Sequence, residues 1–165
     1  MANINFDNGI TMSTVNAAFA AGATTTITSS NNSAGVINGE WVTTLTAANM
    51  ASPTTDATTG VAFVALAPNQ CCALVIGQNK AGTVKMSQGP IIAALTGVTT
   101  TVGGFAYAPQ FPTLPDDFMP LCYTIVSTAP SASAWTPGTS SWTASGVSAT
   151  TFQNVSQLPK RPQIA

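Results

Sequence analysis

The chain has 165 residues, of which 45% are hydrophobic and only 5% are charged, and its formal net charge is −1. This length is enough for the core of one domain, and the hydrophobicity and low net charge are not those of a disordered protein. The four basic residues form no stripe that could neutralise a phosphate backbone, so we expect no nucleic-acid partner. Because so few charges keep copies apart, we expect self-association into a homo-oligomer.

Hydroxyl side chains are abundant, since the chain contains 26 Thr and 14 Ser. Threonine is β-branched and fits a pleated, half-buried strand surface better than it fits a helix. The hydroxyls also give a polar surface to a chain that has little charge. The composition therefore predicts an all-β protein.

The first 35 residues are rich in Asn, Ala, Gly and Thr and form an N-terminal segment, with an intersubunit arm as one interpretation. The opening "MANINFDNGITMSTV" has neither a basic region nor an apolar one, so we expect no secretory signal and synthesis in the cytoplasm. The stretch "STVNAAFAAG" fits one or two helical turns or a strand. A loop is predicted over 29–35, then a strand centred on Trp41 to Leu45, then a flexible stretch over 47–60.

The middle of the chain carries the clearest strand signal. Apolar runs predict strands over 61–67, 71–77 and 83–87, separated by turns at 68–70 and 79–82. Connections of three or four residues suit antiparallel neighbours, because parallel neighbours need a crossover of about a dozen residues. This region is therefore predicted to be an antiparallel meander.

Residues 90–109, "PIIAALTGVTTTVGGFAYAP", form the best candidate for a membrane segment because they carry no charge. Their threonines, glycines and flanking prolines are unsuited to a spanning helix. We expect a pair of strands with a turn here, and no membrane partner.

The stretch "QFPTLPDDFMPLCYTIV" places Asp116 and Asp117 directly before a β-branched run. An aspartate after proline accepts local backbone hydrogen bonds, which favours a turn that leads into a strand over 120–128. A catalytic pair or a calcium ligand is the alternative. Sequence neighbours rarely face one reacting centre, so the turn is the preferred interpretation.

The last part of the chain contains a strong turn dipeptide, Pro137-Gly138, flanked by Trp135 and Trp142. The spacing predicts a hairpin that brings the two rings onto neighbouring positions. A final strand is expected around Thr151 to Val155. Prolines at 159 and 162 then exclude a central strand and predict an extended C-terminal arm.

Several short strands with turn signals between them predict one all-β domain, an antiparallel β-sandwich or a β-barrel-like fold with extended termini. The predicted organisation is an N-terminal segment over 1–35, a β-domain over 36–156 and a C-terminal arm over 157–165.

Several kinds of chemistry find no support in the sequence. The chain contains no histidine, so it lacks a hydrolase triad, and three cysteines do not make a convincing zinc site. Cys71, Cys72 and Cys122 are interpreted as small buried thiols, the first two on opposite faces of one strand. The stretches "GQNKAG" and "TVGGF" match no phosphate or dinucleotide motif. We expect no cofactor, no metal and no enzymatic activity.

Aromatic residues suggest a different function. Tyr107, Trp135 and Trp142 are candidates for a stacking surface that binds carbohydrate, with packing in the core or an interface as the commoner role. A carbohydrate or host-surface binding module is therefore the alternative function.

The stretches "APQFPTLPDDFMPLCYTIVSTAPSASAWTPGTSSW" and "FQNVSQLPKRPQI" resemble structural proteins of tailed-bacteriophage virions. In these proteins a Pro-rich acidic turn enters a strand, and a Trp hairpin precedes a Leu-Pro-x-Arg-Pro-like end. The resemblance covers about the last third of the chain, residues 108–164, with a weaker similarity in "CCALVIGQNKAGTVKMSQGPI". It implies a virion component, such as a capsid decoration (cement) protein or a tail or fibre part. The major capsid protein or other virion proteins are then the expected partners.

The C-terminal arm is the predicted contact surface. It holds Lys160 and Arg161, the only adjacent basic residues, next to apolar Leu158 and Ile164. We expect the arm to leave its own domain and to lie on a neighbouring subunit or the capsid.

Overall fold

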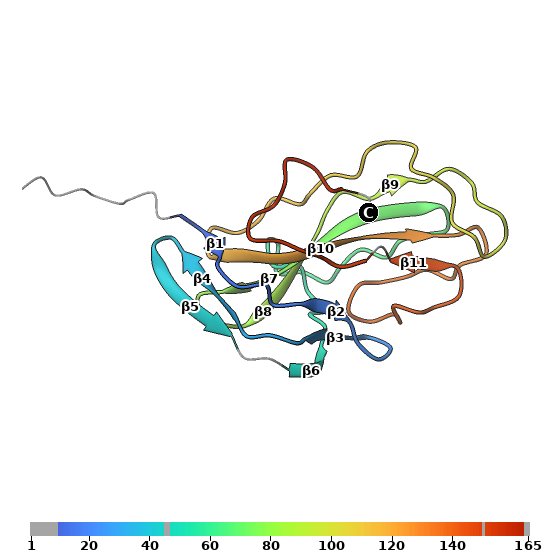
Figure 1. The fold of residues 1–165 in the computed structure, drawn as a ribbon. Coiled ribbons are helices and arrows are strands. Elements are labelled where there is room, and N and C mark those ends of the chain that lie inside the picture. Colours follow the sequence, from blue (N-terminus) through green and yellow to red (C-terminus); the bar gives the residue numbers. More distant parts are fainter. Residues whose placement is uncertain (1–9, 45–46, 150, 164–165) are drawn as a thin grey trace, which may run out of the picture.

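The structure is a computed structural model that describes residues 10–44, 47–149 and 151–163 (Figure 1). These residues form twelve strands and no helix. Neighbouring strands pair antiparallel in all three sheets. The predicted all-β antiparallel fold is therefore confirmed, and the described strands form open sheets and not a closed barrel.

The largest sheet has six strands and is built around a long antiparallel pair. Its main path runs β11-β10-β7-β8, while β12 also pairs with β10 and β9 also pairs with β7. The strands are β7 (Gln70–Asn79), β8 (Val84–Gln88), β9 (Ile92–Ala93), β10 (Phe118–Thr128), β11 (Val147–Ala149) and β12 (Gln153–Asn154).

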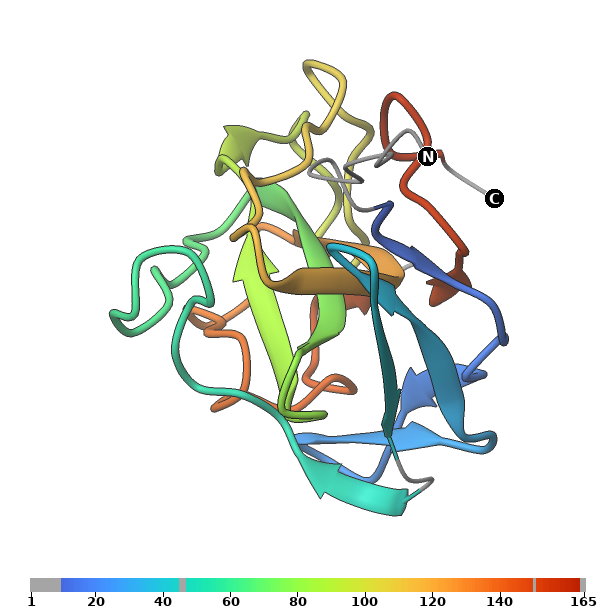
Figure 2. The ribbon, with the colours of Figure 1, turned by 90° about the vertical axis from the view of Figure 1, so that its left-hand side faces the viewer.

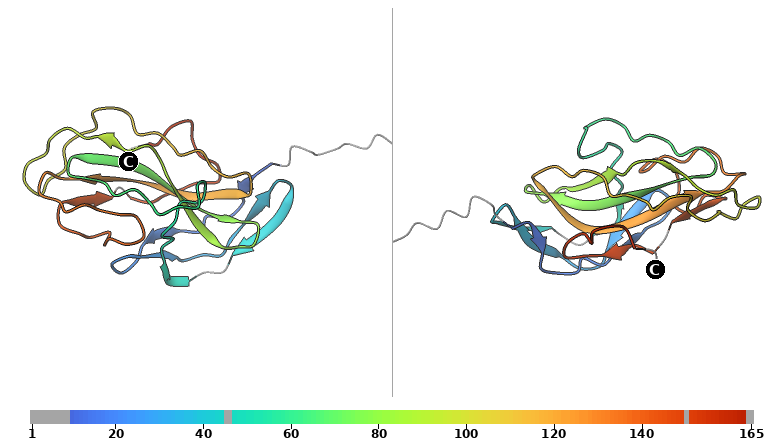
Figure 3. Two further views of the ribbon diagram at one scale, coloured as in Figure 1. Left: turned by 180° about the vertical axis from the view of Figure 1, so that it is seen from behind. Right: turned by 90° about the horizontal axis from the view of Figure 1, so that it is seen from above.

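Two three-stranded sheets come from the N-terminal part of the chain, and they lie together on one side of the large sheet (Figures 2 and 3). One has the order β1-β4-β5 and the other the order β2-β3-β6. Their strands are β1 (Met12–Ser13), β2 (Phe19–Ala21), β3 (Thr26–Ser29), β4 (Ser33–Ile37), β5 (Glu40–Thr44) and β6 (Ala47–Ala51).

The central strands β7 and β10 are buried on both faces, which explains their continuous apolar sequences. One face contributes Leu74 and Ile76 to the larger core cluster, shared with Ile27 and Ile37 of the small sheets. The other face contributes a second cluster of Val75, Phe118 and Tyr123, covered by partly buried Ala57, Phe111, Leu114, Val155 and Leu158. The large sheet is therefore the middle layer of the molecule.

A β-bulge interrupts the pairing of β10 with β7 between Pro120 and Cys122. Proline has no N–H to donate to the ladder, which makes a bulge the natural place for it inside a central strand. The extra residue lets consecutive Leu121 and Cys122 both join the larger cluster. Gly77 lies opposite Pro120, where an added Cβ would lie 2.1 Å from the Met119 carbonyl oxygen, so only glycine fits.

The predicted meander is confirmed for β7, the turn at 79–82 and β8, but the strand predicted over 61–67 is wrong. This stretch makes only the isolated bridges Thr55 with Ala62 and Leu66 with Trp135. The Gln88 side chain replaces a strand partner, since its amide donates to the Val64 carbonyl and accepts from the Val64 N–H. Residues 61–67 therefore have the composition of a strand, but no neighbouring strand pairs with them.

The stretch predicted to be flexible, 47–60, is instead ordered around β6 and Asp56. Asp56 Oδ1 accepts hydrogen bonds from the N–H groups of Thr58 and Thr59. Asp56 Oδ2 accepts from Gln88 N–H at 2.7 Å, and Ala57 N–H donates to the Met86 carbonyl. The segment thus lies along the outer edge of β8 and bonds to the outward N–H of Gln88 and the outward carbonyl of Met86.

The boundary predicted at residue 36 is not a structural division of the described chain. Strand β1 pairs with β4, and β2-β3 pairs with β6, so strands on both sides of this position share sheets. The stretch "STVNAAFAAG" contributes parts of β1 and β2, which settles the choice between helix and strand in favour of strand. Residues 10–35 are therefore part of the domain and not an arm.

The turn between β4 and β5 is formed by Asn38 and Gly39, with φ angles of 50° and 79°. Positive φ at both central residues is typical of a two-residue type I′ hairpin, for which Asn-Gly is the preferred sequence. The sequence prediction of one strand centred on 41–45 missed the partner strand β4. The Asn-Gly dipeptide was the signal that would have revealed it.

Residues 90–109 contain β9 and the isolated bridges Ala94 with Phe105 and Val98 with Thr101. The turn at Val98–Thr101 is closed by hydrogen bonds in both directions between the two residues. Within the part of the chain that the structure describes, no helix is long and apolar enough to cross a membrane.

Candidate interaction surfaces

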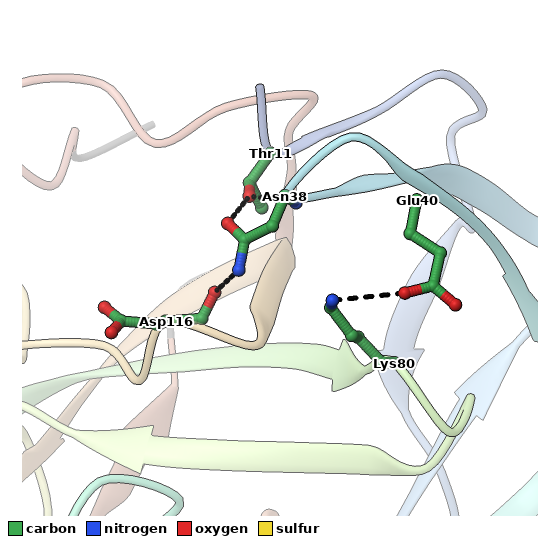
Figure 4. Close-up of polar contacts among 5 residues, drawn as sticks. All are labelled: Thr11, Asn38, Glu40, Lys80 and Asp116. Carbon is green, nitrogen blue, oxygen red and sulfur yellow. Dashed lines mark hydrogen bonds and ion pairs between the residues drawn. The ribbon is translucent and has the colours of Figure 1, made fainter. Parts of the chain in front are cut away.

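Asp116 and Asp117 lie in an exposed turn that leads into β10, as the turn interpretation predicts. Phe118 N–H donates to the Pro115 carbonyl at 3.2 Å and closes the turn. Asn38 Nδ2 donates to the backbone carbonyl of Asp116 at 3.0 Å, and the Asp116 carboxylate points away from this contact (Figure 4). Among the described residues, no group of three or more His, Cys, Asp or Glu side chains is placed to hold a metal ion.

The β4–β5 turn also anchors the start of the described chain. Asn38 N–H donates to Thr11 Oγ1 at 3.2 Å, next to the ion pair of Lys80 and Glu40 (Figure 4). The Lys80 Nζ lies 3.1 Å from the Glu40 Oε2, and the two side chains are 41% and 64% exposed. An ion pair this exposed contributes about 0–1 kcal/mol. These contacts are structural and form no reactive site.

The three thiols are buried, as predicted, and none forms a disulfide. Burial raises the pKa of Cys71 and Cys122, and it raises the pKa of Cys72 to about 12. A weak hydrogen bond from Gln88 Nε2, 3.8 Å from Cys72 Sγ, opposes part of this rise. Thiols held in the protonated form are poor nucleophiles.

The proposed stacking pair, Trp135 and Trp142, is part of the core. The two rings are adjacent, as the hairpin prediction expected, with centroids 5.3 Å apart, but they are only 1% and 4% exposed. Trp142 also packs edge-to-face on Phe152 at 5.4 Å. Because their ring faces are covered by protein, the pair offers no surface for a sugar, and this part of the carbohydrate hypothesis is wrong. Tyr107, the third proposed residue, is 73% exposed.

The Pro137-Gly138 turn is confirmed, although no strand pair flanks it in the described chain. The Thr136 carbonyl accepts from the N–H groups of Thr139 and Ser140, and Trp135 Nε1 donates to the Ser141 carbonyl at 2.8 Å. Trp135 itself bridges to Leu66. The two tryptophans therefore fix a loop against the core.

The C-terminal segment lies on its own domain as far as Gln163. Leu158 packs against the second cluster, Pro162 is buried, and Gln163 N–H donates to the Tyr123 hydroxyl at 3.0 Å. The expectation that the arm leaves its domain is therefore wrong over residues 157–163, because the second cluster on the large sheet offers it apolar surface to cover. Lys160 and Arg161 are exposed, so their role in an interface stays a prediction. Ile164 lies outside the described residues.

A cleft of about 690 Å³ lies where the loop after β6 meets the segments that follow β8 and precede β10. Phe63 and Phe111 line it together with Asp56. Three backbone N–H groups already occupy the Asp56 carboxylate, so it has a structural role. The sequence analysis did not find this cleft, because it assigned one wall to a strand.

A second hollow, the β2–β11 groove, has a volume of about 540 Å³ and is lined by all of β2 and all of β11. The other described residues of its lining are Trp142, Thr143, Thr151 and Phe152, and none of the described lining residues is charged. At one end the carboxamide of Asn154 joins the two sheets, since it accepts from Phe19 N–H and donates to the Phe19 carbonyl. The sequence contains no local signal for this groove, since it forms between strands far apart in the chain.

Large apolar side chains are widely exposed on the described surface. Eight are at least 43% exposed, namely Ile10, Val15, Trp41, Val61, Val64, Leu95, Val98 and Tyr107. Trp41, 61% exposed, lies on the edge strand β5. Single exposed apolar residues are ordinary, but here few charges separate them.

Comparison with known proteins finds no matching family model, no matching curated protein and no matching solved structure.

Proposed function

We propose that this protein is a non-enzymatic structural component of a tailed-bacteriophage virion, a capsid decoration (cement) protein that binds the assembled head through contacts between subunits. The observation that carries the proposal is the surface, on which eight large apolar side chains of the described residues are exposed, in a chain that is only 5% charged. Charged residues are depleted at the core of protein interfaces and aromatic ones are enriched there. A subunit whose surface is mostly interface fits this composition.

The described residues form no reactive constellation, which also supports a structural role. The chain has no histidine, the three thiols are buried and protonated, and the acidic pair lies in an exposed turn. The resemblance of residues 108–164 to virion proteins supplies the biological setting. In that setting the partners are further copies of the chain and the major capsid protein.

A carbohydrate-binding role on a tail or fibre is not retained as a second candidate. Its stacking pair, Trp135 and Trp142, is buried, and only Tyr107 of the three proposed residues is exposed. A single exposed tyrosine does not favour sugar binding over protein contact.

Electron microscopy of the phage particle that carries this gene tests the proposal. We expect density for the β-domain at symmetric positions on the head, and its loss from particles made without the gene. Heads without the protein should rupture at lower temperature, because a bound cement subunit stabilises the assembled state by mass action. Mass spectrometry that finds no copy of the chain in purified virions would contradict the proposal.

A further inference from the structure

Two unpaired strand edges face the β2–β11 groove. Strand β2 is the outer strand of its three-stranded sheet, and β11 is the outer strand of the large sheet. All three residues of each strand line the same hollow. The hydrogen bonds around each strand determine which backbone groups are directed out of the sheet and toward the groove side.

In β2 the odd-numbered residues direct their backbone groups outward. Gly22 N–H donates to the Thr26 carbonyl and Ser30 N–H donates to the Ala18 carbonyl, so even-numbered positions bond to β3. Phe19 and Ala21 therefore point their N–H and C=O groups away from β3. The Asn154 side chain forms hydrogen bonds with both the N–H and the C=O of Phe19. The N–H and C=O of Ala21, in contrast, have no hydrogen-bond partner within the described chain.

The same argument applies to β11. Ala129 N–H donates to the Gly146 carbonyl, which in this register makes Ser127 and Ser148 the next bonded pair with β10. Val147 and Ala149 therefore direct their backbone groups away from β10. Val147 N–H donates to the Ala144 carbonyl, but the N–H and C=O of Ala149 lack a partner among the described residues.

Free backbone groups on both sides define the chemistry of the occupant. An extended polypeptide satisfies an edge by main-chain pairing, and here it would pair on both sides at once. Phe19, Trp142 and Phe152 are buried beneath the lining, whose accessible apolar side chains are Ala20, Ala21, Val147 and Ala149, and no described lining residue is charged. The inserted strand needs apolar side chains on the face toward these residues, polar ones on the other face, and no charge.

Residues 2–6, "ANINF", have this pattern. Ala2, Ile4 and Phe6 alternate with Asn3 and Asn5, and no residue of the five is charged. Alternation with period two indicates a strand buried on one face. Five extended residues span roughly 17 Å, enough to overlap edges that are three residues long.

We propose that residues 2–6 of one copy insert as a strand into the β2–β11 groove of a second copy. A second copy is the donor because the described chain starts at Ile10, passes through β1 on β4, and only then reaches β2. Within one copy, residues 2–6 are therefore connected first to the sheet β1-β4-β5, and not directly to either strand that lines the groove. The inference rests on the proposed function only for the setting in which copies meet.

Matched double variants of the full chain test the insertion. Ile4→Asp with Phe6→Asp places two charges on the buried face, whereas Asn3→Asp with Asn5→Asp places the same two charges on the other face. By sedimentation velocity, the first pair should raise the dissociation constant of the oligomer roughly a hundredfold or more, because two apolar side chains lose their burial. The second pair should change it by less than about threefold, as expected for exposed charges. Equal effects of the two pairs, or a wild-type chain that stays monomeric, would overturn the proposal.

A second measurement identifies the groove and the donor. A benzophenone amino acid at position 6, in a mixture of ¹⁴N and ¹⁵N chains, should form mixed-isotope cross-links to peptides that contain residues 19–21 or 147–152. Hydrogen exchange at the Ala21 and Ala149 amides should slow in the oligomer and not in the Ile4→Asp, Phe6→Asp variant. Cross-links confined to one isotope, or located elsewhere, would overturn the proposal. Detection of the chain on virions tests the proposed function and does not depend on either of these results. The proposed function and this inference can therefore be refuted independently of each other.

Discussion

The side-chain amide of Asn154 forms two hydrogen bonds to the backbone of Phe19, 135 positions earlier in the chain. Its Oδ1 accepts from the Phe19 N–H at 2.7 Å, and its Nδ2 donates to the Phe19 carbonyl at 3.2 Å. Asn154 pairs with β10 through its strand β12, and Phe19 begins β2. One carboxamide thus holds the sheet β2-β3-β6 against the large sheet.

We expect Asn154→Ala to lower the free energy of unfolding by about 1–3 kcal/mol, because it leaves both Phe19 backbone groups without a partner. The neighbouring Gln153→Ala is the matched control, and we expect it to change stability by less than about 0.5 kcal/mol. Denaturant unfolding at constant m-value measures both. Equal losses in the two variants would contradict the role given to Asn154.

The two core tryptophans should respond differently to replacement by phenylalanine. Trp135→Phe leaves the Ser141 carbonyl without its donor, whereas Trp142 Nε1 is buried with no partner among the described residues, so Trp142→Phe removes an unsatisfied group. We expect Trp135→Phe to be the more destabilising by about 1 kcal/mol. Thermal unfolding followed by circular dichroism decides the order, and the reverse order would refute the assignment.

Gly77 should tolerate no side chain. An added Cβ would lie 2.1 Å from the Met119 carbonyl oxygen and 2.6 Å from the Phe118 ring, so Gly77→Ala should destabilise the protein by about 3 kcal/mol. At Gly104 the nearest such atom is a Leu95 methyl carbon at 3.6 Å. Gly104→Ala should therefore stay within about 0.5 kcal/mol of the wild type in the same denaturant measurement. A well-folded, fully stable Gly77→Ala protein would show that β7 and β10 do not approach this closely.

Because the thiols are buried, we expect the free energy of unfolding to fall at alkaline pH. Burial raises the pKa of Cys72 from 9.0 to about 12, so folding favours its protonated form. This contribution is fully present below pH 9 and is lost as the pH rises toward 12, with a slope of up to about 1.4 kcal/mol per pH unit for one group. Unfolding at pH 8 and at pH 10.5 measures it, and Cys72→Ala should reduce the difference. A wild type and variant with the same pH dependence would exclude Cys72 as a cause.

Different substitutions in the C-terminal segment should affect stability and binding separately. Leu158→Ala should lower stability by about 1–2 kcal/mol because Leu158 is partly buried in the second cluster. Lys160→Ala with Arg161→Ala should leave stability unchanged, because both side chains are exposed, but should weaken binding to purified heads. Co-sedimentation with heads measures binding. A double variant that binds as well as the wild type would remove these residues from the interface.

Strands whose signal is local were predictable from the sequence. Continuous apolar, β-branched runs revealed β7, β8 and most of β10, and turn residues located the connection at 79–82. The stretch 61–67 has the same composition, but its Val64 bonds to the Gln88 side chain and not to a strand. Composition shows that a segment suits an extended backbone, and it does not show what pairs with that backbone.

The candidate sites depended on contacts that the sequence does not reveal. Two tryptophans seven residues apart are compatible with a binding face or with a core, and their burial decided for the core. Prolines at 159 and 162 correctly excluded a central strand, but they gave no sign that the Tyr123 hydroxyl would accept from Gln163 N–H. The β2–β11 groove joins residues 19–21 with 147–149, so only the fold could reveal it.

Asp56 lies beside the β8 edge, and its contacts there affect whether copies of this chain aggregate at high concentration. Exposed strand edges invite sideways growth into fibres, and many β-proteins discourage it with rows of lysines. This chain has only four basic residues, so it lacks that defence. Asp56 and Ala57 instead bond to the outward N–H of Gln88 and the outward carbonyl of Met86, so a segment of the chain itself covers this part of the β8 edge. Loss of that carboxylate would therefore leave the Gln88 N–H on this edge free to pair with a strand of another chain.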